Sequence, residues 1–170
     1  MRLVSVAVMT LYSLFADLHK HGEPLLLPNA WDAASAVAIA GAGAKAIATT
    51  SAGVAWSLGV PDGAGLGAER VAAVIARIVA AVGVPVSADI EAGYEDVAAT
   101  VTAVLRAGAV GVNIEDRRNG AGLYESAEQA DRLAAARAAA DGVPFWINAR
   151  TDVFLGGSGR VEEALERSAA

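Results

Sequence analysis

Cysteine is absent from the 170-residue sequence, and histidine is scarce. Without cysteine there can be no disulfide bond, no thiolate metal ligand and no cysteine nucleophile or general acid. The two histidines, His19 and His21, both lie near the amino end, so any metal site has to be built from oxygen ligands. The lack of cysteine also fits a cytoplasmic protein, which is the location we expect.

Basic residues are few and never form a run. The 13 lysines and arginines are outnumbered by 19 acidic residues, which gives a net charge of −6. A chain without a basic patch offers no electrostatic attraction for nucleic acid, so we expect no nucleic-acid partner. No apolar stretch is long enough to span a bilayer convincingly, so we expect no membrane partner either.

The amino end is apolar from Leu3 to Ala16 after a single positive charge at Arg2, as in a weak signal peptide. The residues that follow contain no convincing small-x-small cleavage motif. The favoured interpretation is therefore an extension, residues 1–22, that leads into a helix over about Leu11 to Lys20.

Aromatic residues make up only 5% of the chain, whereas 55% of it is hydrophobic, which is enough for one domain with a real core. From residue 23 to residue 170, short runs rich in Val, Ile or Leu alternate with alanine-rich segments of helical periodicity. The predicted strands are Leu25–Pro28, Ala44–Thr49, Pro85–Asp89, Val110–Glu115 and Pro144–Ala149. The predicted helices are Asp32–Gly41, Ala68–Val82, Asp96–Ala107, Ser126–Ala140 and Val161–Ala170.

This alternation predicts an α/β fold with a parallel sheet, because the strands are apolar on both faces and no hairpin signal separates them. Two architectures fit five such units: a doubly wound, flavodoxin-like open sheet, or part of a (β/α)8 TIM barrel. A flavodoxin-like binding module would need a glycine-rich first loop, and residues 27–31, Leu-Pro-Asn-Ala-Trp, do not supply one.

Polar side chains follow all five predicted strands. Asp89 and Glu91 stand one residue apart after the third strand, and Glu115 ends the fourth. The carboxyl ends of parallel strands meet at one edge of a sheet, and neighbouring carboxylates repel each other unless a cation neutralises them. We therefore predict a site for Mg2+ or Mn2+, which prefer oxygen ligands.

Other strand-end residues have plainer interpretations. Asp32 is predicted to be a helix N-cap, and Asp116 to be a surface carboxylate paired with Arg117 or Arg118. Arg150 suits a bidentate grip on a carboxylate or phosphonate, and the alternative is a buried ion pair with one of the acids.

Five motifs occur in order at these strand ends: LPNAWDAAS at 27–35, TTSAGVAWSLG at 49–59, SADIEAGY at 87–94, GVNIED at 111–116 and INARTD at 147–152. Together they resemble the isocitrate lyase/phosphoenolpyruvate mutase superfamily, in particular phosphonomutase-like and 2-methylisocitrate lyase-like members, over about Phe15 to the end. The resemblance implies an Mg2+-dependent (β/α)8 barrel. It also implies cleavage or transfer at the C–C or C–P bond of a 2-oxo-acid-related carboxylate through a metal-stabilised enolate.

The resemblance also assigns roles to individual residues. Asp89 falls on the first metal carboxylate, Glu91 on the second, and Glu115 on an acid that reaches the metal through water. Ser51, Ala52 and Gly53 fall on the loop that holds the substrate carboxylate. Arg150 matches a substrate-binding arginine that we also expect to act in catalysis, and Asp62 matches an acid near the active site and is the second expected catalytic residue.

The sequence departs from the superfamily pattern at three places. Glu91 stands where the second Asp is usual, and Arg117 to Gly122 replace the Lys-Lys-Cys-Gly-His loop of the lyases. The sequence also ends after the fifth β/α unit, which predicts a partial barrel with a leading helix. The alternative function is therefore a catalytically inactive barrel fragment or a subunit completed by a partner, and we expect a homo-oligomer because unpaired sheet edges tend to associate.

Overall fold

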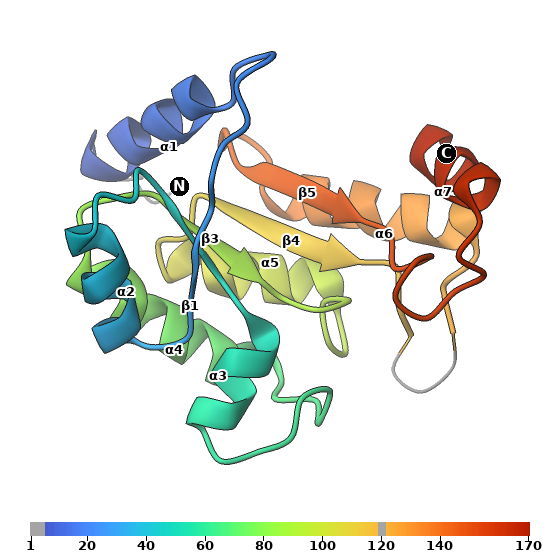
Figure 1. The fold of residues 1–170 in the computed structure, drawn as a ribbon, viewed down its shortest axis with the longest axis horizontal. Coiled ribbons are helices and arrows are strands. Elements are labelled where there is room, and N and C mark those ends of the chain that lie inside the picture. The colour runs from blue at the N-terminus through green and yellow to red at the C-terminus, as the bar shows by residue number, and fades with distance from the viewer. Residues whose placement is uncertain (1–5, 119–121) are drawn as a thin grey trace.

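The computed structural model describes residues 6–118 and 122–170. Its centre is one sheet of five parallel strands in the order β1-β2-β3-β4-β5 (Figure 1). The strands are β1 (Asn29–Ala30), β2 (Ile47–Thr49), β3 (Val86–Asp89), β4 (Gly111–Glu115) and β5 (Trp146–Arg150). Every adjacent pair runs parallel, as the absence of hairpin signals predicted.

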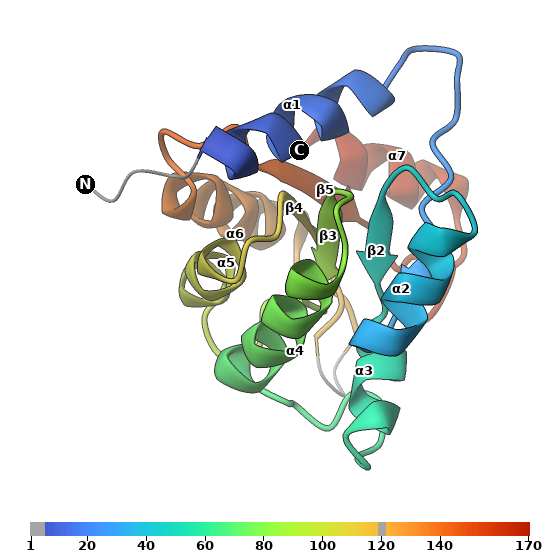
Figure 2. The same ribbon diagram turned by 90° about the vertical axis from the view of Figure 1, so that its left-hand side faces the viewer.

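Helices cover the outer face of the sheet and both of its ends. They are α1 (Val6–Leu18), α2 (Ala33–Gly41), α3 (Ser51–Ser57), α4 (Ala68–Ala81), α5 (Val97–Arg106), α6 (Ser126–Ala139) and α7 (Val161–Ala169). In Figure 2, α2, α4, α5 and α6 form an outer arc, α1 crosses the amino ends of the strands, and α3 lies at their carboxyl ends. Among the described residues, no helix is both long and apolar enough to cross a membrane.

The strand order decides between the two architectures. A doubly wound sheet reverses its strand order at a switch point, whereas here each strand pairs with the next one in sequence without a reversal. Successive right-handed crossovers then place all connecting helices on one face, as in a barrel wall. The fold is therefore five consecutive units of a (β/α)8 barrel, and the flavodoxin-like alternative is wrong.

Most element boundaries follow the sequence signals, but α1 spans Val6–Leu18, whereas the leading helix was expected over about Leu11 to Lys20, and two further elements differ. The Asp32 carboxylate accepts a hydrogen bond from the Ser35 amide and caps α2, as predicted. The first strand, however, is short and begins at Asn29, after the range Leu25–Pro28 in which it was expected. Helix α3 was not predicted at all, because its seven residues, capped by Thr50, were interpreted as a loop.

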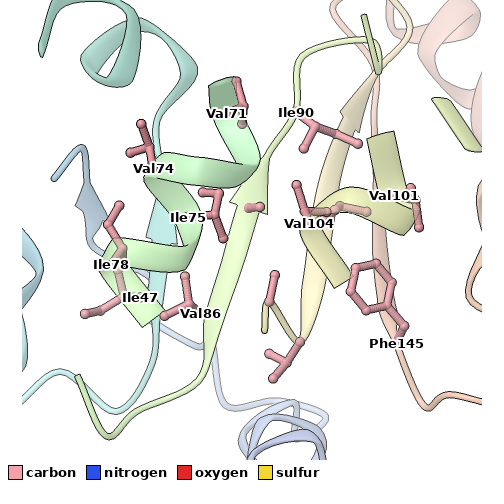
Figure 3. Close-up of a cluster of buried hydrophobic side chains, with 14 of the residues drawn as sticks. Ile47, Val71, Val74, Ile75, Ile78, Val86, Ile90, Val101, Val104 and Phe145 are labelled. Carbon is pink, nitrogen blue, oxygen red and sulfur yellow. The ribbon is translucent and has the colours of Figure 1, made fainter. Parts of the chain in front are cut away.

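The core lies between the sheet and the outer helices. Val71, Val74, Ile75 and Ile78 project from one face of α4 and are all buried, which confirms the helical periodicity seen in the sequence. Figure 3 shows these side chains beside Ile47 and Val86 of the strands, with Val101 and Val104 of α5 completing the cluster. Burial of this apolar surface stabilises the wall that carries the strand ends.

Helix α1 packs against the same core. Tyr12 and Phe15 are each only 2% exposed, and the Tyr12 hydroxyl donates to the carbonyl of Ala109, 3.2 Å away. Burial raises the pKa of Tyr12 to about 12, so this hydroxyl keeps its proton. The ring of His19 stacks on Trp146 at 4.2 Å between centroids. The leading helix thus closes the amino-terminal end of the sheet.

Two valines provide a matched test of this core. Val101 is fully buried on α5, whereas Val37 on α2 is 52% exposed. Val101→Ala is expected to lower the free energy of unfolding by about 2 kcal/mol, because it removes buried methyl groups and leaves a cavity. Val37→Ala is expected to change it by less than about 0.5 kcal/mol. Urea denaturation measures both, and equal losses would contradict this placement of the core.

Candidate active site

The strand register aligns polar side chains in two rows. Asp89 of β3 pairs with Asn113 of β4, and Asn113 pairs with Asn148 of β5. Two residues further along the same strands, Glu115 pairs with Arg150. Side chains two residues apart on a strand point to the same face, so the two rows lie on one face of the sheet. Both rows are at the carboxyl ends of the strands, where α/β barrels hold their sites.

Asp89 is the most constrained member of these rows. Its Oδ2 accepts hydrogen bonds from the Ser51 amide at 3.0 Å and the Ser51 hydroxyl at 2.8 Å. Its Oδ1 accepts from Asn113 Nδ2 at 3.2 Å, and Asn113 in turn accepts from Asn148 Nδ2 at 2.7 Å. Its own amide donates to the Thr49 hydroxyl at 2.9 Å. Groups at the ends of β2 and β4 therefore fix this carboxylate directly, and Asn148 of β5 supports Asn113.

A cavity of about 520 Å³ opens beside Asp89. Seven of the eight residues predicted for the site line it: Ser51, Ala52, Asp62, Asp89, Glu91, Glu115 and Arg150. A second cavity, of about 430 Å³, shares Asn29, Asp89 and Arg150 with the first and extends along the inner face of the sheet to Phe15 of α1 and to His19, which follows α1. The tertiary structure thus brings together side chains from positions 51 to 150.

Gly53 is the predicted site residue that does not line the cavity. Its amide donates to the Thr50 hydroxyl at 3.4 Å, and a Cβ at this position would lie 2.9 Å from the Cβ of Trp31. A larger residue would collide with Trp31, so close packing is the reason that position 53 is a glycine. The Ser51 amide and hydroxyl, predicted to hold substrate, donate to Asp89 in this structure.

Arg150 forms ion pairs with two acids, which is the alternative considered for it from the sequence. Its Nε lies 2.8 Å from Oδ1 of Asp152, its Nη2 lies 3.2 Å from Oδ2, and Nη2 also pairs with Glu115. Asp152 is 1% exposed and was not identified from the sequence. The only sequence feature that pointed to a role for Asp152 is its position two residues after Arg150 in the INARTD motif.

The prediction for Asp116 was wrong. Its side chain is 2% exposed and does not pair with Arg117 or Arg118. Instead it accepts hydrogen bonds from the Thr151 hydroxyl at 2.7 Å and the Asp152 amide at 2.8 Å, and it lies 3.5 Å from Nη1 of Arg167. Asp116 thereby holds the turn that carries Asp152, and through it Arg150.

Glu91 begins a strained loop at the edge of the cavity. Its φ of 52° lies in the left-handed region, as does the φ of 53° at Tyr94, and neither residue is glycine. Such strain costs free energy and is concentrated at functional sites. Burial raises the pKa of the Glu91 carboxyl, and the nearby charges of Asp62 and Asp89 raise it further, against an opposing effect of Tyr94.

Of the carboxyl groups that line the cavity, Glu115 has the most strongly raised pKa. Burial raises its pKa to about 7, and the charges of Asp89, Asp152 and Glu91 act in the same direction, whereas Arg150 opposes the shift. Such excess negative charge is what a bound cation would relieve.

The donor set suits a hard cation that keeps part of its water shell. Within residues 6–118 and 122–170, no group of three or more acidic or histidine side chains is arranged so that it could hold a metal ion. Mg2+ is commonly held by one or two carboxylates and several waters, and Asp89, Glu91 and Glu115 are carboxylates that line the same cavity.

Comparison with known proteins finds a family match over almost the whole chain. The family described as phosphoenolpyruvate phosphomutase matches residues 15–170. An uncharacterised protein of Mycobacterium tuberculosis is 40% identical over 141 residues, which are 82% of this chain and 53% of the relative. The chain therefore spans about half the length of the curated relatives that it matches.

Solved structures show the same relationship. A candidate phosphonomutase from Burkholderia cenocepacia is 44% identical with a TM-score of 0.85, over 92% of this chain and 66% of that one. A phosphoenolpyruvate phosphomutase from Streptomyces platensis subsp. rosaceus is 28% identical with a TM-score of 0.83, and the match covers 93% of this chain and 59% of that one. Oxaloacetate acetylhydrolase is 29% identical with a TM-score of 0.80, and the match covers 95% of this chain and 57% of that one.

The shifted Glu115 carboxyl predicts a pH-dependent stability in the presence of a chelator. Its pKa in the folded state, about 7, is above its ordinary value near 4.5, so the folded state binds this proton more tightly than the unfolded state does. This contribution is complete below about pH 4.5 and is lost as the pH rises through about 7. The melting temperature in EDTA should therefore fall between pH 5.5 and 8.

Glu115→Gln is the matched control for this prediction, because glutamine keeps the shape of the side chain but does not titrate. The variant should show a smaller fall in melting temperature across the same pH range. Identical slopes for the two proteins would show that Glu115 titrates normally in the folded chain.

Proposed function

Because the chain belongs to the phosphoenolpyruvate phosphomutase family, within the isocitrate lyase/phosphoenolpyruvate mutase superfamily, we propose that it is a lyase or mutase. The proposed reaction cleaves or transfers a group at the C–C or C–P bond of a small 2-oxo-acid-related carboxylate or phosphonate. The observation that carries the proposal is the single cavity that gathers Asp62, Asp89, Glu91, Glu115 and Arg150.

Mg2+, with Mn2+ as the substitute, is the proposed cofactor. Asp89 and Glu91 would hold it directly and Glu115 through water, and its charge would favour the ionised form of both glutamates, whose pKa is raised mainly by burial and further by neighbouring acids. When bound, the cation would supply positive charge to stabilise the enolate oxygen as the bond to C3 breaks.

The protein's own residues position the substrate in this proposal. Asp89 needs little reorganisation, because Ser51 and Asn113 already fix both of its oxygens. Asp152 holds the Arg150 guanidinium through Nε and Nη2, so its Nη1 can bind a substrate carboxylate or phosphonate. Asp62 reaches the cavity from an exposed loop and is the proposed proton-transferring acid.

The open edge of the sheet favours a second candidate function. Among the described residues, strand β5 has a partner only on its β4 side, and Trp146, Asn148 and Ala149 on it are exposed. An unpaired strand edge tends to associate. This supports a subunit that needs a partner for activity, with a homo-oligomer as the proposed assembly. Size-exclusion chromatography with light scattering would test it, and a stable monomer with full activity would exclude it.

Metal titration calorimetry tests the proposed cofactor site. Asp89→Ala should weaken Mg2+ binding by about tenfold or more, because it removes a direct ligand. Asp131→Ala, an exposed aspartate on α6 outside the cavity, is the matched control and should bind Mg2+ as the unaltered chain does. An unchanged Mg2+ affinity in Asp89→Ala would overturn the metal assignment.

A product assay tests the reaction itself. We expect the 170-residue chain to release pyruvate from a small 2- or 3-substituted dicarboxylate or from a phosphonate in the presence of Mg2+, and to lose this activity in EDTA. Asp62→Asn should lower kcat by about 100-fold or more if Asp62 transfers the proton. Turnover that is unaffected by EDTA would contradict the proposed mechanism.

A further inference from the structure

The loop after β3 is held in a strained conformation by hydrogen bonds to its carbonyl groups. Glu91 and Tyr94 adopt φ values of 52° and 53°, which are costly for residues that carry a side chain. Each of the four carbonyl groups of residues 90–93 nevertheless accepts a hydrogen bond. Two of the donors are the backbone amides of positions 93 and 115, and the other two are side chains. The conformation of Glu91 therefore depends on side chains outside the loop.

The two side-chain donors come from α5 and α6, which are neighbours in the outer arc of helices (Figure 2). The hydroxyl of Thr100, on α5, is completely buried and donates to the carbonyl of Gly93 at 2.8 Å. Nη2 of Arg132, on α6, donates to the carbonyl of Ala92. Ala92 is only 8% exposed, so a carbonyl left without this donor would be poorly hydrated. Arg132 thus satisfies the residue that directly follows Glu91.

The surroundings of Arg132 indicate that this contact, and not an ion pair, places its guanidinium. Arg132 forms no ion pair with any residue of the described chain. Its Nε is buried without an acceptor among the described residues, although buried donors are normally paired. Its Cζ lies 4.1 Å from the centroid of the Tyr124 ring, and cation–π attraction offsets part of that cost. The side chain is therefore held by Tyr124 and the Ala92 carbonyl.

The two proposed metal ligands of this segment are fixed in different ways. Both oxygens of Asp89 accept hydrogen bonds directly from Ser51 and Asn113. The carboxylate of Glu91 has no such set of donors among the described residues, so its position follows from the left-handed backbone. Loss of the Arg132 contact should therefore displace Glu91 and leave Asp89 in place.

We propose that Arg132 is a positioning residue for Glu91, because its hydrogen bond to the Ala92 carbonyl holds the loop in the conformation that presents Glu91 to the cavity. This inference rests on the proposed function, since it takes Glu91 to be a ligand of the proposed cation. It adds a residue of the outer helical layer that does not line the cavity itself. Groups that support metal ligands from behind commonly change metal affinity by about tenfold or more.

Magnesium titration calorimetry on the 170-residue chain tests the inference. Arg132→Met keeps a long side chain beside Tyr124 but removes every donor, and should weaken Mg2+ binding by about tenfold. Arg132→Lys restores a cationic donor and should recover part of that loss. Arg137→Met is the matched control, because this α6 arginine donates to the carbonyls of Ala140 and Val143, both at 3.1 Å, and lies outside the cavity. It should lower the melting temperature and leave Mg2+ affinity unchanged.

A double-mutant cycle distinguishes action through Glu91 from general damage to the fold. In a Glu91→Gln background, Arg132→Met should weaken Mg2+ binding further by less than about twofold, because the charged ligand that it positions is already absent. The electron paramagnetic resonance spectrum of bound Mn2+ gives an independent signature. Arg132→Met and Glu91→Gln should change that spectrum in the same way, and Arg137→Met should not change it. If Arg132→Met fails to fold, Arg132→Lys takes its place, and its smaller loss should likewise disappear in the Glu91→Gln background.

The outcomes separate this inference from the proposed function. If the unaltered chain binds Mg2+ and Arg132→Met binds it equally well, the assignment of Arg132 is overturned and the proposed metal site stands. If Arg137→Met weakens binding as much as Arg132→Met does, or if the two losses in the cycle are additive, the role is structural only and the assignment is also overturned. If the unaltered chain binds no Mg2+, the proposed cofactor site fails and this inference fails with it.

Discussion

The carboxylate of Asp89 is held from both sides, and the geometry of the cavity depends on that contact. Ser51 at the start of α3 binds one oxygen, and Asn113 of β4, itself bound by Asn148 of β5, binds the other. The hydrogen bonds therefore tie β2, β3, β4 and β5 together at their carboxyl ends. Because a partly buried carboxylate without hydrogen-bond partners is costly, this network stabilises the fold and orients the proposed metal ligand at the same time.

A second set of contacts extends the same constraint to the cationic side of the cavity. Buried Asp116 holds the Thr151–Asp152 turn, Asp152 holds Arg150, and the continuation of that turn at Gly156 supports Arg117. The acids of the site thus have distinct tasks. Among the acids that line the cavity, Asp89 and Glu91 form no ion pair with any described residue and are suited to a cation, whereas Asp152, held by Asp116, places Arg150. This division explains how one small volume can contain so many charges.

Much of this arrangement could be predicted from the sequence. The alternation of apolar runs and helical segments indicated five parallel β/α units, and the polar residues after each run located the site, including Asp89, Glu115 and Arg150. Helix α3 was missed because a seven-residue helix carries too little periodicity to be recognised. The roles of Asp116, Asp152 and Gly53 were missed because each depends on a neighbour distant in sequence or on close packing.

The sequence by itself determined the fold class and the residue types at the strand ends, because periodicity and strand-end chemistry are local properties of the chain. Only the tertiary structure decided that the sheet is wound in one direction as a barrel wall, since strand order depends on contacts between distant segments. Only the tertiary structure decided which charges are paired, because an ion pair depends on distances that the register of β4 and β5 sets. That register sets Arg150 opposite Glu115, with which it forms an ion pair.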